Sequence, residues 1–398
     1  MLSPVASAEQ NALLDKSLVA VVLAGVCTFL EVYNTQPLLP FLQTVFHASE
    51  SRVSLTVSAT TLGIAVAAPI IGLLAESLGR RKVIVPSLFG LTIPTFLAAT
   101  AHSLGALLFW RFLQGLFVPG IIAIMITYIG EEWAGRGVGA MMSAYVSGTV
   151  LGGFLGRFLS AQVVTHFRWQ DSFLLLGALN LLGAILVWRW LPPSATFKRA
   201  PGILHTVRHT GEHFLNWPLV TNFVTGFTVL FSLVGAFTSI NFYLAAPPLG
   251  LGPAALGNVF FVYLLGLIIT PVSGHFLDRR GFLRTAAAAV AMGIAGLSLT
   301  LIHSLWAIIP GLAVFSSGIF ILQSAATVQT GRLAEKARSS ATGLYVTFYY
   351  IGGSCGAALL AWMYSVAGWP SCVAILVFAM IGTLVFARAS RETQGVTT

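Results

Sequence analysis

GLLAESLGRRKV, at residues 72–83, lies between two long apolar segments of the chain. A segment that crosses a bilayer must satisfy its own backbone hydrogen bonds, and a helix does so. The polar residues between the two segments are therefore predicted to form a tight loop between two membrane-spanning helices. Because Lys and Arg accumulate in cytoplasmic loops, the cations Arg80, Arg81 and Lys82 place this loop on the cytoplasmic side. The loop predicts the orientation of the whole chain.

The composition of the chain is that of a polytopic membrane protein. Its 398 residues are 57% hydrophobic and 8% charged, with a mean hydropathy of +0.88, whereas a soluble domain has roughly 25% charged residues. The net charge of +9 does not indicate nucleic-acid binding, because most of the cations lie in predicted cytoplasmic loops and termini. Cys27, Cys355 and Cys372 lie in or beside apolar runs without metal or redox spacing, so we expect them to be packing residues.

Apolar segments long enough to cross a membrane recur along the chain. A span needs about 20 apolar residues, and with Gly, Pro and charged residues as boundaries the sequence yields twelve. The first six lie at residues 17–41, 53–75, 83–101, 104–129, 138–164 and 172–190. The last six lie at residues 218–245, 254–277, 283–302, 305–329, 340–366 and 371–387. The first run is too long for a signal-peptide core, so we expect an uncleaved span and two cytoplasmic termini.

A polar, basic segment with two prolines separates the two groups of spans. We therefore predict an N-terminal six-helix bundle at residues 1–190, a cytoplasmic linker at residues 191–216 and a C-terminal six-helix bundle at residues 217–398. The linker histidines His205, His209 and His213 recur every four residues. Such a row of histidines more often lies on a solvated or interfacial helix face, so we expect no metal site.

The second half repeats features of the first. Trp169 returns as Trp369, and the glycine-rich run after Tyr145 returns after Tyr345. The polar loop at residues 72–83 returns as Gly274, Asp278, Arg279, Gly281 and Arg284. Two parallel six-helix repeats are a plan known for secondary transporters, with the substrate near the membrane midplane between the halves. The internal repeat therefore favours a transporter.

The first of these loops resembles a signature of the major facilitator superfamily, Gly-x-Leu-Ala-Asp-Arg-x-Gly-Arg-Arg, found between its second and third helices. The matching residues are Gly72, Leu74, Ala75, Gly79, Arg80 and Arg81. Glu76 and Ser77 replace the commoner Asp and Arg. The whole chain is most similar to the YnfM- and AraJ-type exporters of the drug/proton antiporter branch. The resemblance implies an all-α protein of 12 transmembrane helices in two six-helix repeats, in the bacterial inner membrane.

Glu31 is the one acidic residue deep inside a predicted span. A carboxyl group in a partly apolar cavity favours its neutral form, which is the property that a proton-coupling group requires. Arg111 opens Arg-Phe-Leu-Gln-Gly, which resembles the fourth-helix signature of the family, where the Arg modulates a first-helix carboxylate. At about 1.5 Å per residue, Arg111 and Glu31 reach similar depths and can meet. The alternatives are that Glu31 is only a static partner for a buried Arg, and that Arg111 snorkels to the membrane surface.

Gly148, Gly152 and Gly156 recur every fourth residue of the fifth span, so they share one helix face and permit close approach of a neighbouring helix. This run resembles the family's antiporter signature but departs from it at Gly153 and Arg157. Simple helix packing and a coupling role both remain open. We expect Arg157 to form a structural clamp with Asp171 at the start of the sixth span, with a substrate contact as the alternative.

Acidic residues at the end of the fourth span can pair with the cations of the 72–83 loop. In the resemblance, such a cluster closes the cytoplasmic side when the transporter is open to the outside. The alternative is a set of solvated loop charges. The candidate gating residues are Gly72, Glu76, Gly79, Arg80, Arg81, Glu131, Glu132, Gly274, Asp278 and Arg279.

Uncharged polar and aromatic residues within the spans are candidates for a substrate cavity, because such walls suit small ligands. They are Tyr33, Asn34, Gln36, Gln114, Tyr145, Asn222, Asn241, Tyr263, Gln323, Tyr345 and Tyr349. Part of this set is expected to face neighbouring helices instead.

We expect a proton-coupled exporter of small organic solutes, sugars or drugs, that works by alternating access as a monomer. The rival within the transporter class is an uptake symporter or facilitator, and the rival of another class is a membrane sensor or scaffold. No nucleophile–base set, nucleotide-binding glycine loop or metal site is present in the sequence. The sequence therefore predicts that the protein is not an enzyme and needs no cofactor. Its expected partners are the substrate, protons and lipid.

Overall fold

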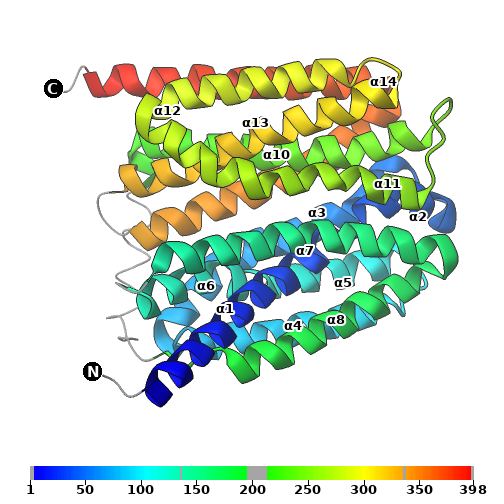
Figure 1. Cartoon of the computed structure of the whole chain (residues 1–398). Helices are drawn as coiled ribbons and strands as arrows, with labels where there is room; N and C mark the ends of the chain where they lie inside the picture. The colour runs from blue at the N-terminus through cyan, green and yellow to red at the C-terminus, as the bar shows by residue number, and fades with distance from the viewer. Residues whose placement is uncertain (1–3, 135–136, 195–212, 335–337, 396–398) are drawn as a thin grey trace.

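The computed structural model describes residues 4–134, 137–194, 213–334 and 338–395, and this part of the chain consists of helices joined by short loops, without strands. Figure 1 shows two groups of helices lying side by side, with α1 to α8 in one group and α10 to α14 in the other. Both termini lie at the same end of the molecule, here called the terminal end, and the opposite end is called the far end. The prediction of an all-α membrane fold is confirmed.

The helices of the first group follow the predicted spans closely. They are α1 (Pro4–Val32), η1 (Gln36–Leu38), α2 (Leu39–Phe46), α3 (Glu50–Leu78), α4 (Arg81–Ala98), α5 (Leu104–Phe117), α6 (Pro119–Glu132), α7 (Val138–His166) and α8 (Trp169–Trp190). Two spans are divided between elements: α1, η1 and α2 form the first, and α5 and α6 form the fourth.

The second group contains longer continuous elements. They are η2 (His213–Leu215), α10 (Trp217–Ala245), α11 (Pro253–Val259), η3 (Phe260–Leu265), α12 (Gly266–Leu299), α13 (Leu305–Leu333) and α14 (Arg338–Gly395). Eleven stretches of the described residues are long and apolar enough to cross a membrane, and the last of them covers 48 residues. Gly368 interrupts α14 with a φ of 71°, so this last stretch supplies two spans.

The two halves share local geometry as well as sequence. Gly79 and Gly281 occupy corresponding positions in the two loops, with φ values of 93° and 73°. In this left-handed region a residue with a Cβ is strained, which explains glycine at both turns. Trp169 and Trp369 are both buried. The structure therefore contains the internal repeat that the sequence pattern indicates.

Glycines of α7 let α1 approach it closely. A Cβ added to Gly148, Gly152 or Gly156 would lie 2.0 to 2.3 Å from a main-chain oxygen of α1. The second half repeats this packing, because Gly352 and Gly356 meet the main chain of α10 in the same way. Helix packing by small residues is thus present, as the spacing of four predicts.

Gly156→Ala is expected to destabilise the protein by about 1–3 kcal/mol, the usual cost of overpacking a tight contact. The added methyl group would meet Leu30 O at 2.0 Å and push on the backbone just before Glu31. Thermal unfolding of the purified protein measures the effect. Gly139→Ala on the same helix is the matched control, since a Cβ there has no atom within 4 Å, and equal melting of the two variants would contradict the packing argument.

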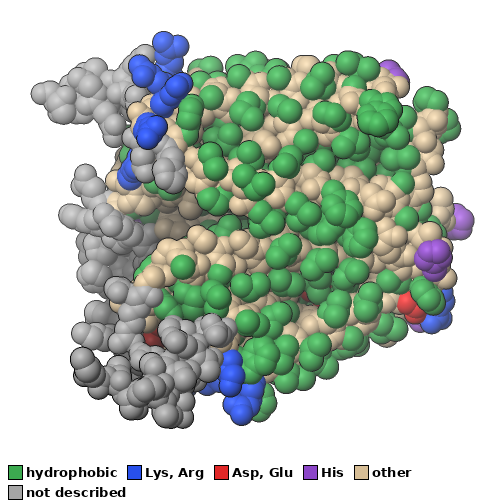
Figure 2. Space-filling model, in the orientation of Figure 1, with side chains coloured by type: hydrophobic (Ala, Val, Ile, Leu, Met, Phe, Trp, Pro, Cys, Tyr) green, Lys and Arg blue, Asp and Glu red, His purple; other side chains and the backbone are tan. Residues whose placement is uncertain are grey.

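Basic side chains gather at the terminal end in Figure 2, whereas the far end shows histidines and one small group of acidic and basic side chains. This distribution follows the pattern that places Lys and Arg in the cytoplasm, and the cytoplasmic location of both termini stays a prediction. The division into residues 1–190, 191–216 and 217–398 also stays a prediction. Most of the predicted linker, with His205 and His209, lies outside the described residues.

Candidate functional site

The first span is interrupted beside Glu31. Helix α1 ends at Val32, and a short 3-10 helix with Pro37 in its first turn follows at residues 36–38. Proline has no N–H with which to continue the hydrogen bonds of the helix. In the turn before it, Gln36 N donates to Tyr33 O at 3.0 Å. The last carbonyl groups of α1 therefore need donors from elsewhere in the protein.

Arg111 of α5 supplies these donors. Its Nη1 donates to Glu31 O at 2.6 Å, and its Nη2 donates to Val32 O at 2.6 Å. Its Nε donates to Thr56 O of α3 at 3.1 Å. The side chain is fully buried, so a single guanidinium joins three helices at the break in α1.

The carboxyl group of Glu31 is held more loosely. It is fully buried, Gln114 Nε2 lies 3.5 Å from its Oε2, and its Oε1 has no hydrogen-bond partner among the described residues. Gln114 also donates to Thr95 Oγ1 at 2.7 Å and accepts from Arg111 Nη1 at 2.7 Å. A buried carboxyl oxygen without a partner is costly when ionised. The site suits a group that exchanges a proton.

The structure brings Glu31 and Arg111 together, as their predicted depths indicate, but no ion pair joins them in the described part of the chain. The guanidinium binds main-chain oxygens, and Gln114 connects it to the carboxyl group. Sequence reasoning missed Thr56 and Thr95, which take part in this network. Thr95 takes part through its hydroxyl group, a polar group inside an apolar span, whereas Thr56 takes part through its main-chain oxygen, which leaves no sequence signal.

Arg157 of α7 lies in a second buried site. Its guanidinium carbon lies 4.6 Å from the ring centre of Tyr33, 4.6 Å from that of Tyr263 and 4.8 Å from that of Phe260. These three residues are here called the aromatic cage. Since Tyr263 and Phe260 belong to η3, the cage joins the two halves of the protein.

Two oxygens accept hydrogen bonds from Arg157. Its Nη1 donates to Gly153 O at 2.6 Å, and its Nε donates to Gln36 Oε1 at 2.7 Å. Gln36 in turn donates to Thr238 Oγ1 of α10 at 3.1 Å. Gln36 therefore connects the cation of α7 to the other half of the protein.

The predicted clamp between Arg157 and Asp171 is wrong. Asp171 instead accepts from the backbone N–H of Arg168 at 3.0 Å and pairs with the Arg168 side chain at 3.4 Å, which caps α8. Arg157 lies nine residues before the end of α7, about 13 Å along the helix axis. The cation is thus too deep in the span to reach the loop where Asp171 lies.

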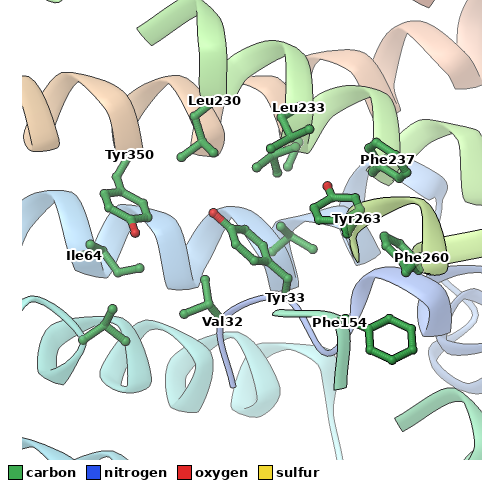
Figure 3. Close-up of a cluster of buried hydrophobic side chains, with 14 of the residues drawn as sticks. Val32, Tyr33, Ile64, Phe154, Leu230, Leu233, Phe237, Phe260, Tyr263 and Tyr350 are labelled. Carbon is green, nitrogen blue, oxygen red and sulfur yellow. The ribbon is translucent and has the colours of Figure 1, made fainter. Parts of the chain in front are cut away.

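Most of the predicted cavity tyrosines lie close to the contact between the halves. Tyr145, Tyr263 and Tyr345 are buried, and their hydroxyl groups have no hydrogen-bond partner among the described residues. Figure 3 shows Tyr33, Tyr263 and Tyr350 extending into the region between α3 and α10. Tyr350 was missed by the sequence prediction, although it adjoins the predicted Tyr349, whose ring it meets edge to face at 5.3 Å.

The predicted amides divide into two groups. Asn34 is fully buried at the break in the first span, and both polar atoms of its side chain lack a partner among the described residues. Asn222 donates to Ala326 O and Thr330 Oγ1 and joins α10 to α13, while Asn241 donates to the carbonyl of Phe237 on its own helix. Gln323 is half-buried. These contacts indicate packing roles for Asn222 and Asn241.

Among the described residues of the predicted gate, Arg80 and Glu131 form a well-defined ion pair. Arg80 Nη2 lies 2.8 Å from Glu131 Oε1, and its Nε donates to both carboxyl oxygens at 3.1 and 3.3 Å. Arg81 Nη2 donates instead to Trp188 O at the end of α8, at 2.6 Å. Arg279 is exposed, and a Cβ on Gly274 would have no atom within 4 Å. The side chains at Gly72, Glu76 and Asp278 lie outside the described residues, and Glu132 has an interaction of its own.

Arg80→Glu is expected to lower thermal stability modestly, by about 1 kcal/mol, because the pair is partly exposed and solvent screens it. The exchanged variant, with Arg80→Glu and Glu131→Arg together, is expected to recover most of the loss. The melting temperatures of the two single variants and of the double variant measure the coupling. Additive losses in the double variant would show that the two side chains do not stabilise each other.

Contacts between the two halves lie in the middle and far parts of the spans. Ser58 Oγ donates to Ser354 O at 2.8 Å, and Ser354 Oγ donates back to Ser58 O at 3.1 Å. Nearer the far end, Gln162 Nε2 donates to Asn258 Oδ1 at 3.3 Å. In the described residues, the side-chain hydrogen bonds near the terminal end, such as that of Arg80 with Glu131, stay within one half.

Comparisons with known proteins agree with this architecture. A sequence model of the Major Facilitator Superfamily matches residues 21–356. The chain belongs to this superfamily. The inner membrane transport protein YnfM of Escherichia coli is 31% identical over 93% of this chain and 89% of its own length. The uncharacterized transporter YybF of Bacillus subtilis is 29% identical over 91% and 90% of the two chains.

A solved structure of the nucleoside transporter NupG, in a variant form, superposes with a TM-score of 0.74 at 14% identity, over 93% of this chain and 99% of that one. This likeness shows the fold of the superfamily. The family and the curated relatives are transporters, so the prediction that the chain is a multi-pass membrane transporter and not an enzyme is confirmed.

Proposed function

We propose that the chain is a proton-coupled secondary exporter of small organic solutes in the bacterial inner membrane. The observation that carries this proposal is the geometry of Glu31. Its carboxyl group is fully buried at the break in the first span, with one oxygen unpartnered among the described residues. An acid at such depth is costly and marks a functional site.

The contacts of Arg111 support a proton-carrying role for Glu31. The cation holds the main chain of residues 31 and 32 and not the carboxylate. Glu31 can therefore gain or lose its proton without breaking the tie that fixes the end of α1. The nearby positive charge also favours the ionised carboxylate in a medium of low dielectric, so a change in this environment can release or take up the proton.

The contacts between the halves support alternating access. The hydrogen bonds between the halves join the middle and far parts of the spans, while those that the described residues make near the terminal end, such as Arg80 with Glu131, lie within one half. The basic residues at the terminal end support a cytoplasmic location for it, and on this basis we assign the arrangement to a state closed to the outside. Rocking of the halves would exchange these contacts for others at the cytoplasmic end.

A flux assay in proteoliposomes tests the proposal. Vesicles with the purified protein are loaded with a panel of sugars, cationic dyes and organic acids, and efflux is followed with a proton gradient of either sign or none. The proposal predicts that a proton gradient opposite to the solute flux accelerates efflux of at least one solute. Flux that ignores the gradient would identify a facilitator, and no flux in any condition would identify a sensor or scaffold.

A further inference from the structure

The buried charges of the described residues do not balance. Two guanidinium groups, those of Arg111 and Arg157, are buried in the membrane-spanning region with one carboxyl group, that of Glu31. Glu31 belongs to the network of Arg111, on α1, α3 and α5. Arg157 therefore has no counter-charge of its own among the described residues.

The surroundings of Arg157 compensate its charge only in part. Two neutral oxygens accept its hydrogen bonds, and three rings of the aromatic cage face the guanidinium within 4.8 Å. Cation–π contacts contribute about 0.5–2 kcal/mol each, whereas an unpaired charge in hydrocarbon costs several kcal/mol or more. A bound anion would supply the missing charge, and guanidinium matches carboxylate with two parallel hydrogen bonds.

The aromatic cage also offers a hydrogen-bond donor beside Arg157. The hydroxyl of Tyr263 has no partner among the described residues. Figure 3 shows Tyr33 and Tyr263 beside apolar residues of α10, namely Leu230, Leu233 and Phe237. Donors beside apolar walls suit a ligand with an acidic group and an apolar body.

On the basis of the proposed transport function, we propose that the solute is a small organic anion whose carboxylate, or a similar acidic group, pairs with Arg157 while its apolar body lies against the aromatic cage. The anion would bind where Gln36 Oε1 now accepts a hydrogen bond from Arg157 Nε at 2.7 Å. An arriving carboxylate displaces this neutral oxygen, because a charged acceptor binds a guanidinium more strongly.

This displacement has a consequence for the contact between the halves. The same Gln36 side chain donates to Thr238 Oγ1 and, at 3.4 Å, to Val234 O of α10. When the amide moves away from Arg157, these bonds between the first span and α10 loosen. Binding of the anion thereby weakens one of the ties that keep the far end closed.

The substitution Gln36→Glu tests the anion site with an isosteric change. It places a carboxylate 2.7 Å from Arg157 Nε, where the amide oxygen now lies, and so supplies the counter-charge from within the protein. We expect this variant to be more heat-stable than the wild type and to bind organic anions at least about tenfold more weakly. Arg157→Gln should lose anion binding as well but without the gain in stability.

The probes are matched in shape and differ in charge: benzoate, benzamide and benzylamine, together with butyrate and butyramide. Binding is measured by the shift in thermal unfolding and by calorimetry on the purified protein. We expect stabilisation by the anions of the set and not by the amides or the amine. Arg168→Gln is the control, because Arg168 is an exposed cation at the far end and its loss should leave anion binding unchanged.

Binding of the amides as tightly as the acids, or of no anion in the set, would overturn the inference. Unchanged anion binding in both Gln36→Glu and Arg157→Gln would also overturn it. These outcomes are separate from those of the proposed function. Proton-coupled flux of neutral or cationic solutes alone would support proton coupling and exclude the anion site. Anion binding without proton movement would support the anion site and exclude proton coupling.

Discussion

Arg111→Met is expected to melt at least about 5 °C below the wild type, a larger loss of stability than that of Gly156→Ala or Arg80→Glu. The substitution removes donors from three buried carbonyl groups, those of Glu31, Val32 and Thr56. Each buried acceptor left without a partner costs about 1–3 kcal/mol. The break in the first span would then lose the group that holds it against α3 and α5.

Two further variants make this prediction specific. Arg111→Lys should recover only part of the loss, because an ammonium group is a point charge and lacks the planar fork that reaches several acceptors. Arg52→Gln removes an exposed cation near the start of α3 and should leave the melting temperature unchanged. If Arg111→Met melted with the wild type, the role of Arg111 as the tie at the helix break would be excluded.

Glu31→Gln is expected to abolish proton movement coupled to the solute, while the protein remains folded. Glutamine keeps the shape of the side chain and its contact with Gln114, and it removes the carboxyl group that we propose as the proton carrier. Downhill exchange of solute should stay within about tenfold of the wild-type rate, because the pathway itself is unchanged. Radiolabelled solute exchange and gradient-driven accumulation, measured in the same vesicles, separate the two activities.

Glu50→Gln is the matched control for this variant. Glu50 is the first residue of α3 at the far end of the molecule, outside the buried network, and its loss should leave proton coupling intact. Gradient-driven accumulation that persists in Glu31→Gln would show that another group carries the proton.

The fold could be predicted from the sequence because the bilayer leaves few alternatives. A chain with long apolar runs must form helices there, and basic loops then give the order and direction of the spans. The glycine at position 79 and its repeat at position 281 already indicated two related turns, and both have a positive φ in the structure. The close packing of α7 on α1 likewise follows from glycines spaced by four residues.

The partners within the site were harder to predict. Sequence patterns report side-chain types, whereas Arg111 binds main-chain carbonyl groups that no pattern records. Pro37 can be recognised in the sequence as a helix-distorting residue, but it does not indicate which group binds the carbonyls that the break frees. Pairing charges by proximity in the sequence placed Arg157 with Asp171, although three rings and an amide surround Arg157 instead.

Contacts between the halves were also outside the reach of the sequence. Ser58 and Ser354 exchange hydrogen bonds across the interface, yet each is an isolated small polar residue within an apolar span. Such pairs arise from the relative placement of two bundles, which a single sequence does not encode locally. The polar residues of a span therefore predict a site more readily than they predict its partners.

The most direct test of the central claim is a recording of internal pH in proteoliposomes that contain either the wild type or Glu31→Gln, while solute is added under an imposed proton gradient. The account predicts solute-dependent proton movement in the wild type and none in Glu31→Gln. Equal solute transport by both proteins without any proton flow would contradict it. The protein would then be a facilitator, with Glu31 as a structural member of the Arg111 network.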